Sequence, residues 1–492
     1  MITTVTHYPI PDQAAAKVLG SPLRNAGYSE DSIHRLLGED AYSGDRDEVA
    51  VEARRLPATP LATIVRLFFL QLPVSKSDAV RALGPRGVEA IESTGLAEVG
   101  ATVEPRVRIL PIGRVLLASD GYSRDGEDPP DYVATYTPTA RVLDSLTPRP
   151  EVERALDVGT GSGVQALLAA RHTRHVVATD VNERALAYTK LNAALNGLMN
   201  IECRQGSLFD PVAGEKFDLV VCNAPYVVSP ETRWAYRDSE FQADELSERV
   251  VGSAAEHLAP GGFASVLVSW LAANESNPDE RVLAWAKATG CDSWILTSLN
   301  SDPLDHAAEW NSHLAGDAKA YGEALEEWTR YFERLGVRTV SEGAVLLHRR
   351  DGEPTSRIDP IDEDDLDDAS DQIERAFEAR AWLARLGKSS ELLSERLALA
   401  MPLRLERELE PEDGGTVITD ERVELSEGTK HAVDTTEEAL EVLTSLNGQP
   451  LGDIVQEVAD RLQLTEAEKI RLSREAVSLT RELLELGALR VR

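Results

Sequence analysis

The sequence contains no apolar run long enough to cross a membrane. A membrane-spanning helix needs about 20 apolar residues, whereas the longest apolar stretch, 61–74, is shorter and is interrupted by Arg66. The first residues also lack the basic and then apolar segments of a secretory signal. We therefore expect a cytoplasmic protein without a membrane partner.

Cysteine is scarce, with three residues in a chain of 492, and these are Cys203, Cys222 and Cys291. They are far apart and odd in number, which excludes a disulfide framework and a metal site built on a close cysteine pair. His172 and His175 flank a loop, but a third ligand is missing. We expect three reduced, mostly buried thiols and no metal.

Positive charge is also in short supply, because 51 basic residues face 84 acidic ones and the net charge is −33. The excess of acid grows along the chain, and only the first quarter is close to neutral. A chain of this charge lacks the electrostatic footprint of a general nucleic-acid binder. A local basic patch in the N-terminal part stays possible on sequence grounds.

The length of the chain and its 42% hydrophobic content predict two to four domains with real cores. Residues 1–125 have apolar spacings of three and four, followed by alternation over 100–118, and so predict helices and then a two-stranded wing. The predicted helices are 49–55, 61–72, 78–83 and 88–95. Such a winged-helix-like module binds DNA or protein, and the charge favours protein.

Residues 126–352 alternate short apolar strands with helices, which predicts a parallel sheet covered on both faces. The predicted strands are 154–158, 175–179, 201–205, 219–222, 263–269, 292–297 and 338–349. The predicted helices are 163–172, 183–196, 240–258 and 279–289, with a helical insertion near 303–335. The last two strands are expected to form an antiparallel hairpin at the edge of the sheet.

Two further segments complete the chain. Residues 353–372 are strongly acidic and predict a solvated linker. Residues 373–492 predict a second winged-helix-like domain, with strands at 423–425 and 489–491 around helices 436–446, 451–462 and 466–486.

A glycine-rich turn follows the first predicted strand of the sheet. The strand ends in Asp157, and Gly159, Gly161 and Gly163 then lead into a helix, with Thr160 between the first two. Glycine lets a backbone bend sharply and approach a ligand closely, and ligands of such sheets bind at the carboxyl ends of the strands. The spacing G-x-G-x-G differs from the G-x-G-x-x-G fingerprint of dinucleotide sites, which argues against NAD.

Polar residues also end the next two strands. Asp180 closes the second strand, where a carboxylate accepts hydrogen bonds from both hydroxyls of a ribose, and Val181 follows it. Ser207 and Leu208 follow the third strand, at positions suited to the amino edge and the face of an adenine.

The fourth strand delivers Asn223, Ala224, Pro225 and Tyr226 to the same edge of the sheet. The side-chain oxygen of Asn223 and the backbone carbonyl of Ala224 can accept hydrogen bonds from an NH2 group. Tyr226 offers a ring face to a flat amide or base. Holding a nitrogen in line with a methyl donor is catalysis by orientation, so this segment predicts the catalytic centre.

Together these motifs resemble the amino-methylating branch of the class I S-adenosylmethionine-dependent methyltransferases. That branch includes release-factor glutamine methyltransferases, small-domain ribosomal RNA guanine methyltransferases and amino-adenine methyltransferases. The resemblance implies an α/β, Rossmann-like, seven-stranded sheet flanked by the two winged-helix-like domains, and S-adenosylmethionine as cofactor. It implies that the cofactor contacts Asp157, Gly159, Thr160, Gly161, Gly163, Asp180, Val181, Ser207, Leu208 and Asn223. Asn223 and Tyr226 would hold the acceptor.

Two positions depart from the family pattern, since Ala224 replaces a proline and Ser207 stands where aspartate is common. Three functions follow from the residues. The favoured one is methylation of a protein glutamine, the second is methylation of an amino group on an RNA or DNA base, and the third is a catalytically silent binding module. Arg233, Trp234, Tyr236 and Arg237 either bind substrate or order the loop after the motif.

Overall fold

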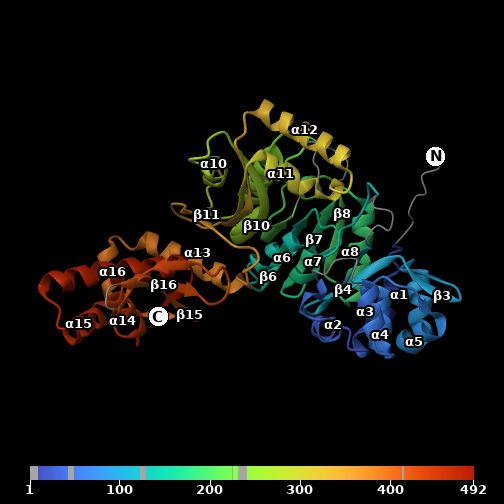
Figure 1. The fold of residues 1–492 in the computed structure, drawn as a ribbon, viewed down its shortest axis with the longest axis horizontal. Coiled ribbons are helices and arrows are strands. Elements are labelled where there is room, and N and C mark those ends of the chain that lie inside the picture. The colour runs from blue at the N-terminus through green and yellow to red at the C-terminus, as the bar shows by residue number, and fades with distance from the viewer. Residues whose placement is uncertain (1–8, 43–48, 122–128, 224, 231–240, 413–414) are drawn as a thin grey trace.

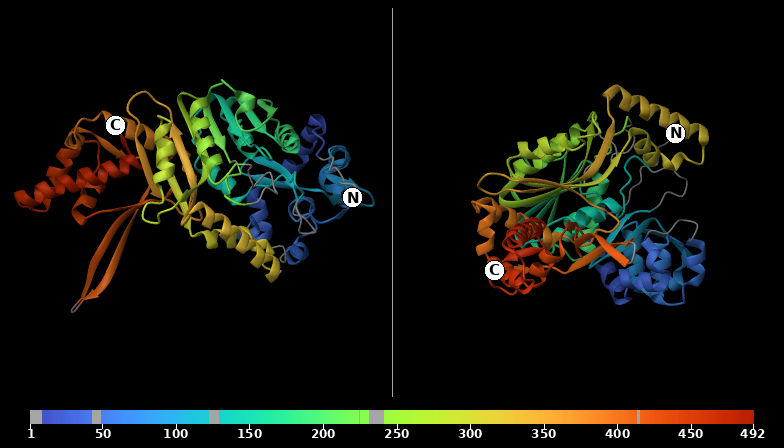
Figure 2. Two further views of the ribbon diagram at one scale, coloured as in Figure 1. Left: turned by 90° about the horizontal axis from the view of Figure 1, so that it is seen from above. Right: turned by 60° about the vertical axis from the view of Figure 1, so that its left-hand side comes forward.

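The computed structural model describes residues 9–42, 49–121, 129–223, 225–230, 241–412 and 415–492. A helical N-terminal part, a central part built on a large sheet and a C-terminal part follow one another (Figure 1). The left view of Figure 2 shows the N- and C-terminal parts at opposite ends of the central part. Among the described helices, none combines the length and the apolar character needed to span a bilayer.

Eight strands form the central sheet, in the order β13-β11-β12-β10-β9-β6-β7-β8. They are β6 (Val152–Val158), β7 (Thr173–Asp180), β8 (Ile201–Gln205), β9 (Phe217–Cys222), β10 (Leu258–Ala272), β11 (Asp292–Ser301), β12 (Thr339–His348) and β13 (Ser356–Pro360). All neighbours are parallel except β12, which runs antiparallel to both β10 and β11. The predicted α/β, Rossmann-like class is therefore confirmed.

The edge of the sheet differs from the prediction in two ways. The expected number of seven strands is wrong, because β13 pairs in parallel with β11 and adds an eighth. The last two predicted strands, β11 and β12, do pair in antiparallel fashion, but β12 lies inside the sheet between β10 and β11. The cause is that β13 covers the edge on which the hairpin was expected.

Both faces of the sheet are buried at its centre, which is why β9 is almost wholly apolar, whereas the edge strands β8 and β13 are more polar and only partly buried. Successive strand residues point to opposite faces. Ala155 packs with Leu219 in one core, whereas its neighbour Leu156 packs with Val220 in another. Helices α6 (Pro138–Ser145), α7 (Val164–Ala169) and α13 (Ser370–Arg385) contribute to the first core, and α9 (Glu245–His257) and α10 (Glu280–Ala288) to the second.

The N-terminal part consists of helices followed by short strands. The helices are α1 (Gln13–Asn25), α2 (Glu30–Leu37), α3 (Val49–Arg55), α4 (Pro60–Ile64), a π-helical turn (Val65–Phe69) and α5 (Lys76–Ser93). The strands β1 (Val74–Ser75), β2 (Ala97–Val99) and β3 (Thr102–Pro105) form a sheet in the order β1-β3-β2, and β4 (Val107–Ile112) pairs with β5 (Val115–Asp120). The two helices predicted at 78–83 and 88–95 correspond to the two helical stretches of α5, which are separated by a non-helical Gly84 (φ 74°, ψ 165°).

The hairpin β4–β5 joins the N-terminal part to helix α8 (Glu183–Leu195). The amide of Asn192 spans the main chain of Ala118, accepting from its N–H at 2.8 Å and donating to its carbonyl at 2.7 Å. Asn196 does the same at Leu116. Arg184 forms a buried ion pair with Asp120, which also accepts from the hydroxyl of Tyr188 at 2.7 Å. Polar contacts of several kinds thus hold the two elements together.

Two helices between β11 and β12 form the predicted insertion, α11 (Pro303–Trp310) and α12 (Ala318–Leu335). Their apolar faces enclose Ala307, Trp328 and Phe332 in a small core of their own. His306 is fully buried there and its Nε2 contacts the carbonyl of Val228 at 3.1 Å, so the insertion packs against the segment that follows β9.

The C-terminal part follows α13. Its strands are β14 (Leu397–Leu399), β15 (Leu403–Glu412), β16 (Gly415–Leu425), β17 (Ala432–Asp434) and β18 (Leu489–Val491), and its helices are α14 (Glu437–Thr444), α15 (Leu451–Arg461) and α16 (Glu466–Glu485). The three predicted helices therefore form, and the predicted strand at 423–425 is the end of a longer ribbon, β15–β16, that projects from the body (Figure 2). The winged-helix-like character of the N- and C-terminal parts stays a prediction.

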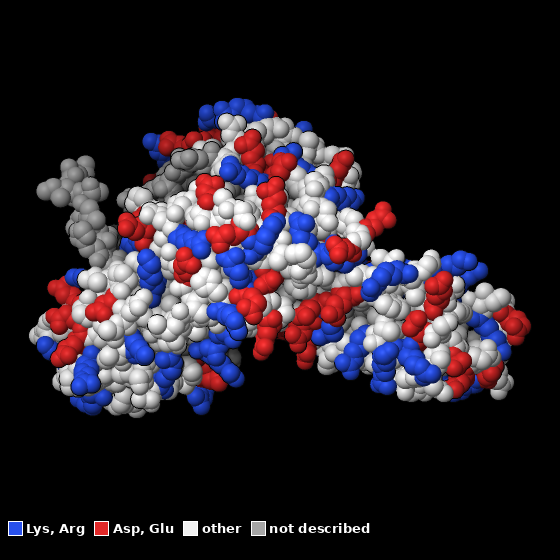
Figure 3. Space-filling model, turned by 180° about the vertical axis from the view of Figure 1, so that it is seen from behind, with Lys and Arg blue, Asp and Glu red and all other residues white. Residues whose placement is uncertain are grey.

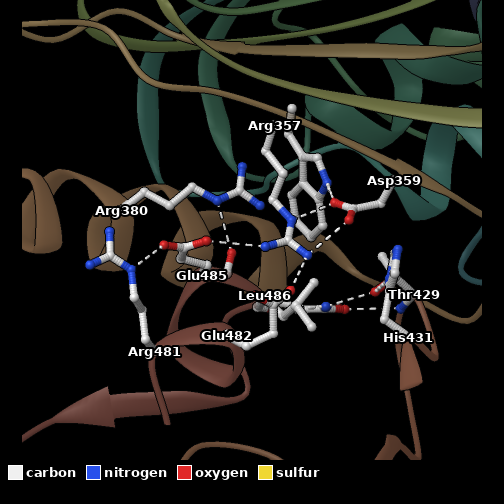
Figure 4. Close-up of polar contacts among 11 residues, drawn as sticks. Arg357, Asp359, Arg380, Thr429, His431, Arg481, Glu482, Glu485 and Leu486 are labelled. Atoms are coloured by element: carbon white, nitrogen blue, oxygen red, sulfur yellow. Dashed lines mark hydrogen bonds and ion pairs between the residues drawn. The ribbon is translucent and has the colours of Figure 1, made fainter. Parts of the chain in front are cut away.

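The segment 353–372, predicted to be a linker, contains strand β13 and the first turn of α13. Arg357 explains why this segment is structured, because its guanidinium connects β13 to helix α16 (Figure 4). Arg357 contacts Asp359 and Glu482, each at 2.5 Å, and Glu485 at 3.1 Å. The acidic run thus begins with a structured strand that attaches the C-terminal part to the sheet.

Charge is unevenly distributed on the face of the molecule seen from behind (Figure 3). Acidic side chains gather between the central and C-terminal parts, whereas both ends carry both signs. Among the described side chains, this face therefore offers no continuous basic track for a nucleic-acid backbone.

Candidate active site

The glycine-rich turn after β6 is held by a buried carboxylate. Asp157 Oδ2 accepts hydrogen bonds from Thr160 Oγ1 at 2.6 Å and from the N–H of Ala166 at 2.9 Å. Gly159 and Gly161 have φ angles of 68° and 55°, which favour glycine. Burial raises the pKa of Asp157 to about 6, against the opposing effect of its hydrogen bonds. The turn is therefore fixed at both ends before any ligand arrives.

Gly163 packs against helix α8, unlike Gly159 and Gly161, which line the cleft. It precedes α7 with a φ of 89°, and a Cβ there would lie 2.8 Å from Thr189 Oγ1 and 3.1 Å from Thr189 Cα. It does not line the cleft. Its conformational freedom lets α7 approach α8, and its contact with the cofactor stays a prediction.

Asp180 ends β7 beside the turn. Its Oδ2 accepts from the N–H of Gly161 at 2.9 Å and its Oδ1 from the N–H of Asn182 at 2.8 Å. Burial raises its pKa. A carboxylate has about four lone-pair positions, so two remain for a ligand's hydroxyls. The next residue, Val181, is 54% exposed at the rim of the cleft, as an apolar contact for a ligand would be.

The loop after β8 approaches Asp180 from the other side. The N–H of Gly206 donates to the carbonyl of Asp180 at 3.0 Å. Leu208 adopts a left-handed conformation with φ 47°, which is uncommon for a residue with a side chain, and its carbonyl accepts from Thr179 Oγ1 at 3.1 Å. Such strained residues cluster at ligand sites. Ser207 and Leu208 both line the cleft.

The predicted catalytic segment follows β9 directly. Asn223, Pro225 and Tyr226 line the cleft, whereas Ala224 lies outside the described residues, as do Arg233, Trp234, Tyr236 and Arg237. The hydroxyl of Ser269, on neighbouring β10, donates to the carbonyl of Tyr226. Burial raises the pKa of Tyr226 well above its usual value, so the side chain is a neutral phenol.

All these predicted residues except Gly163 and the undescribed Ala224 border one cavity of about 1670 Å³. Small-molecule sites usually measure about 300–1,000 Å³, so the cleft has room for a cofactor and for part of a substrate. Residues 137–139 also line it, while Thr137 caps α6 by accepting from the N–H of Ala140. That segment therefore starts a helix and also faces the cleft.

The sequence analysis missed one wall of the cleft, which consists of Glu309 and Trp310 from α11, Glu342 from β12 and residues 361–364 after β13. Burial, and then the charge of Glu309, raises the pKa of Glu342 to about 7. A lone acidic residue within an otherwise apolar strand was the available signal, because such residues are rarely buried without a role.

The residues present fit S-adenosylmethionine. Asp180 has free acceptor positions for two ribose hydroxyls, Val181 and Leu208 offer apolar contacts for an adenine, and the turn of Gly159 and Gly161 leaves backbone close to the cavity. The cleft lies at the carboxyl ends of β6, β7 and β9, where sheets of this class bind their ligands.

Comparison with known proteins gives matches to the central and N-terminal parts of the chain. Residues 137–284 match the family described as "Methyltransferase small domain", and residues 25–108 match a domain of unknown function (DUF7059). The predicted resemblance to class I methyltransferases is thereby confirmed for the central part.

Three curated relatives illustrate the match. The chain is 38% identical over 103 residues to the release factor glutamine methyltransferase of Aliivibrio fischeri, covering 20% of this chain and 36% of that protein. It is 32% identical over 173 residues to the protein of the same name from Geobacter sulfurreducens, covering 32% and 58%. It is 35% identical over 124 residues to the ribosomal protein uL3 glutamine methyltransferase of Bradyrhizobium diazoefficiens, covering 23% and 39%. The chain thus spans between about a third and three fifths of the length of these relatives.

A solved methyltransferase from Pyrococcus furiosus covers 48% of the chain, with 18% identity and a TM-score of 0.28; the match takes in 90% of that protein.

Proposed function

We propose that this chain, whose residues 137–284 match a methyltransferase small domain, transfers a methyl group from S-adenosylmethionine to a planar nitrogen of a macromolecule, a protein glutamine being favoured. One observation carries the proposal. Asn223 and Tyr226 border the same cavity as Asp157 and Asp180, so an acceptor nitrogen and a bound cofactor would meet in one enclosed space.

The cofactor would lie along the carboxyl edge of the sheet. Asp180 would bind the ribose, Val181, Ser207 and Leu208 the adenine, and the turn from Asp157 to Gly161 the methionine part. When bound, S-adenosylmethionine supplies an electrophilic methyl group on its sulfonium. The protein's contribution is a rigid cradle, because the hydrogen bonds of Asp157 and Asp180 fix the turn in advance.

Asn223 and Tyr226 would position the acceptor. The side-chain oxygen of Asn223 accepts a hydrogen bond from an NH2 group, which points the nitrogen lone pair at the methyl group, and the Tyr226 ring stacks on a planar amide. The carbonyl of Tyr226 is held by Ser269, so the segment is fixed to β10. Orientation is sufficient here, because the proton can leave the nitrogen during or after transfer.

A protein substrate is favoured over a nucleic acid by the charge of the cleft. Glu309, Glu342 and Glu363 line it beside Tyr226, and the whole chain carries a net charge of −33. Phosphates would be repelled there. The matched relatives are named for glutamine methylation of release factors and of ribosomal protein uL3. The second candidate function, methylation of an RNA or DNA base, is supported by the nearly neutral charge of the N-terminal part. The third, a catalytically silent binding module, is supported by Ala224 in place of the family's proline.

The test is to incubate the full chain with methyl-labelled S-adenosylmethionine and a cell extract, and then to treat samples with protease or nuclease. Label released by protease alone, and found on glutamine by mass spectrometry, is the expected result. Label released only by nuclease would refute the glutamine assignment. Cofactor binding without any transfer would support the silent module. Asn223→Ala should abolish transfer and leave cofactor affinity within a few-fold.

A further inference from the structure

The acidic wall of the cleft comes from three separate elements. Glu309 ends α11, Glu342 lies in β12, and Asp362, Glu363 and Asp364 follow β13. None of the described residues that line the cavity is a lysine, arginine or histidine. Within the described part of the chain, the one basic side chain at ion-pair distance from this wall is His306, whose Nδ1 lies 3.5 Å from Glu342 Oε1. Among the described residues, the wall is therefore short of positive charge.

Glu342 is the most enclosed member of the wall. Its side chain is 14% exposed, and its polar neighbours in the described structure are His306, 3.5 Å from its Oε1, and the Trp310 indole, neither of which is a fixed cation. It is paired in register with Ser269 on one side and Leu299 on the other. Because Ser269 holds the carbonyl of Tyr226, Glu342 lies one strand away from the acceptor segment. A buried carboxylate without full compensation is costly, and a cationic ligand would offset that cost.

Tyr226 connects the wall with the acceptor site. Tyr226, Glu342 and Glu363 line the same cavity, and the phenol pKa is raised first by burial and then by the charges of the two carboxylates. Trp310 and Phe241 also line this end of the cavity. Carboxylates combined with aromatic faces are the chemistry that binds guanidinium and ammonium groups.

We propose that Glu309, Glu342 and Glu363 bind a lysine or arginine side chain of the protein substrate, close in sequence to the glutamine that is methylated. The inference rests on the proposed function and names its substrate class as a basic protein segment. The three residues lie beyond the matched methyltransferase domain, 137–284, so the site belongs to the insertion and the edge of the sheet in this chain.

The experiment uses the full chain and three pools of synthetic peptides with one fixed glutamine. Arginine, citrulline or glutamate occupies the positions one to three residues from it, citrulline being the neutral isostere of arginine. Methyl transfer and binding, by fluorescence anisotropy with S-adenosylhomocysteine present, are measured for each pool. The test variant is Glu309→Gln/Glu363→Gln, and the matched control is Glu333→Gln, an exposed glutamate of α12 that does not line the cleft.

We expect the arginine pool to bind and react about tenfold better than the citrulline pool, as for a charge-assisted hydrogen bond. The double variant should lose this preference, and Glu333→Gln should keep it. Equal binding of all three pools, or no binding of any, would overturn the inference. So would a double variant that binds S-adenosylhomocysteine more weakly, because the carboxylates would then serve the cofactor.

Failure of the proposed function gives a different pattern. If no pool is methylated but arginine-dependent binding is present and disappears in the double variant, the cation site stands and the glutamine assignment falls. If peptides are methylated with no arginine preference, the glutamine assignment stands and the cation site falls.

Discussion

Replacing Asp180 with asparagine should separate cofactor binding from folding. The two oxygens of Asp180 each accept a backbone N–H, from Gly161 and from Asn182. An amide has one oxygen, so in either orientation of the substituted side chain one of these N–H groups faces an NH2 group. The same change removes the negative charge and at least one of the two acceptor positions left for the ribose.

The expected size of the effect follows from these contacts. Hydrogen bonds to a charged group contribute about 1.5–3 kcal/mol each and neutral ones about 0.5–1.5 kcal/mol. Weakening two ribose contacts should therefore cost about 3 kcal/mol of binding free energy, or about a hundredfold in Kd. The misplaced backbone donor should lower the free energy of unfolding of the free protein by about 1 kcal/mol.

The assay is isothermal titration calorimetry with S-adenosylhomocysteine, together with urea unfolding. Asp210→Asn is the matched control, because Asp210 is exposed near the same edge of the sheet and does not line the cleft. A wild-type Kd in a folded Asp180→Asn protein would refute the placement of the ribose. Equal weakening in Asp210→Asn would show that net charge, and not a contact, sets the affinity.

Three further predictions concern stability. Gly163→Ala should lower the free energy of unfolding, measured by urea titration, by about 2–4 kcal/mol, because it combines a φ of 89° with a clash on Thr189. The control Gly197→Ala has a φ of 70° and open space around it, and should lower the same free energy by about 1–2 kcal/mol. The pKa of Asp157 is raised from 3.8 to about 6, so its carboxyl favours the folded state at low pH and loses this contribution as pH rises through 6. As pH rises from 4 to 7, the free energy of unfolding of the unmutated chain should therefore fall by up to about 3 kcal/mol relative to that of Asp157→Asn. A difference between the two proteins that does not change with pH would contradict the assigned burial. Arg357→Ala should cost about 2 kcal/mol and make the segment after β13 more sensitive to protease, since it leaves Glu482 and Glu485 without their shared cation.

The sequence predicted which strand-end residues would meet at the cleft, for a physical reason. Asp157 and Asp180 end buried apolar strands, and the carboxyl ends of neighbouring parallel strands meet at one edge. Strand ends and glycine turns are local features, so their spacing along the chain is enough to bring the residues together. The packing of Gly163 against α8 could not be predicted in this way, because spacing does not tell whether a glycine faces a ligand or the neighbouring helix.

The opposite wall could not be predicted in this way. Glu309 and Glu363 come from an insertion and from the segment after an eighth strand, and their meeting depends on β12 entering between β10 and β11. The acidic run around Glu363 looked like a solvated linker because composition alone does not reveal that Arg357 anchors it to α16.

The contacts between α8 and β5 have a practical consequence for dissecting the molecule. Asn192 donates at 2.7 Å to Ala118 in β5 and at 2.8 Å to Ser162 in the glycine turn, so one side chain touches both the N-terminal part and the cofactor loop. A fragment trimmed to residues 137–284 would remove the N-terminal partners of this amide, of the Arg184 guanidinium and of the apolar face around Leu191. The smallest autonomous folding unit that contains the cleft therefore begins before β4, and truncation at the family boundary should yield an aggregating fragment.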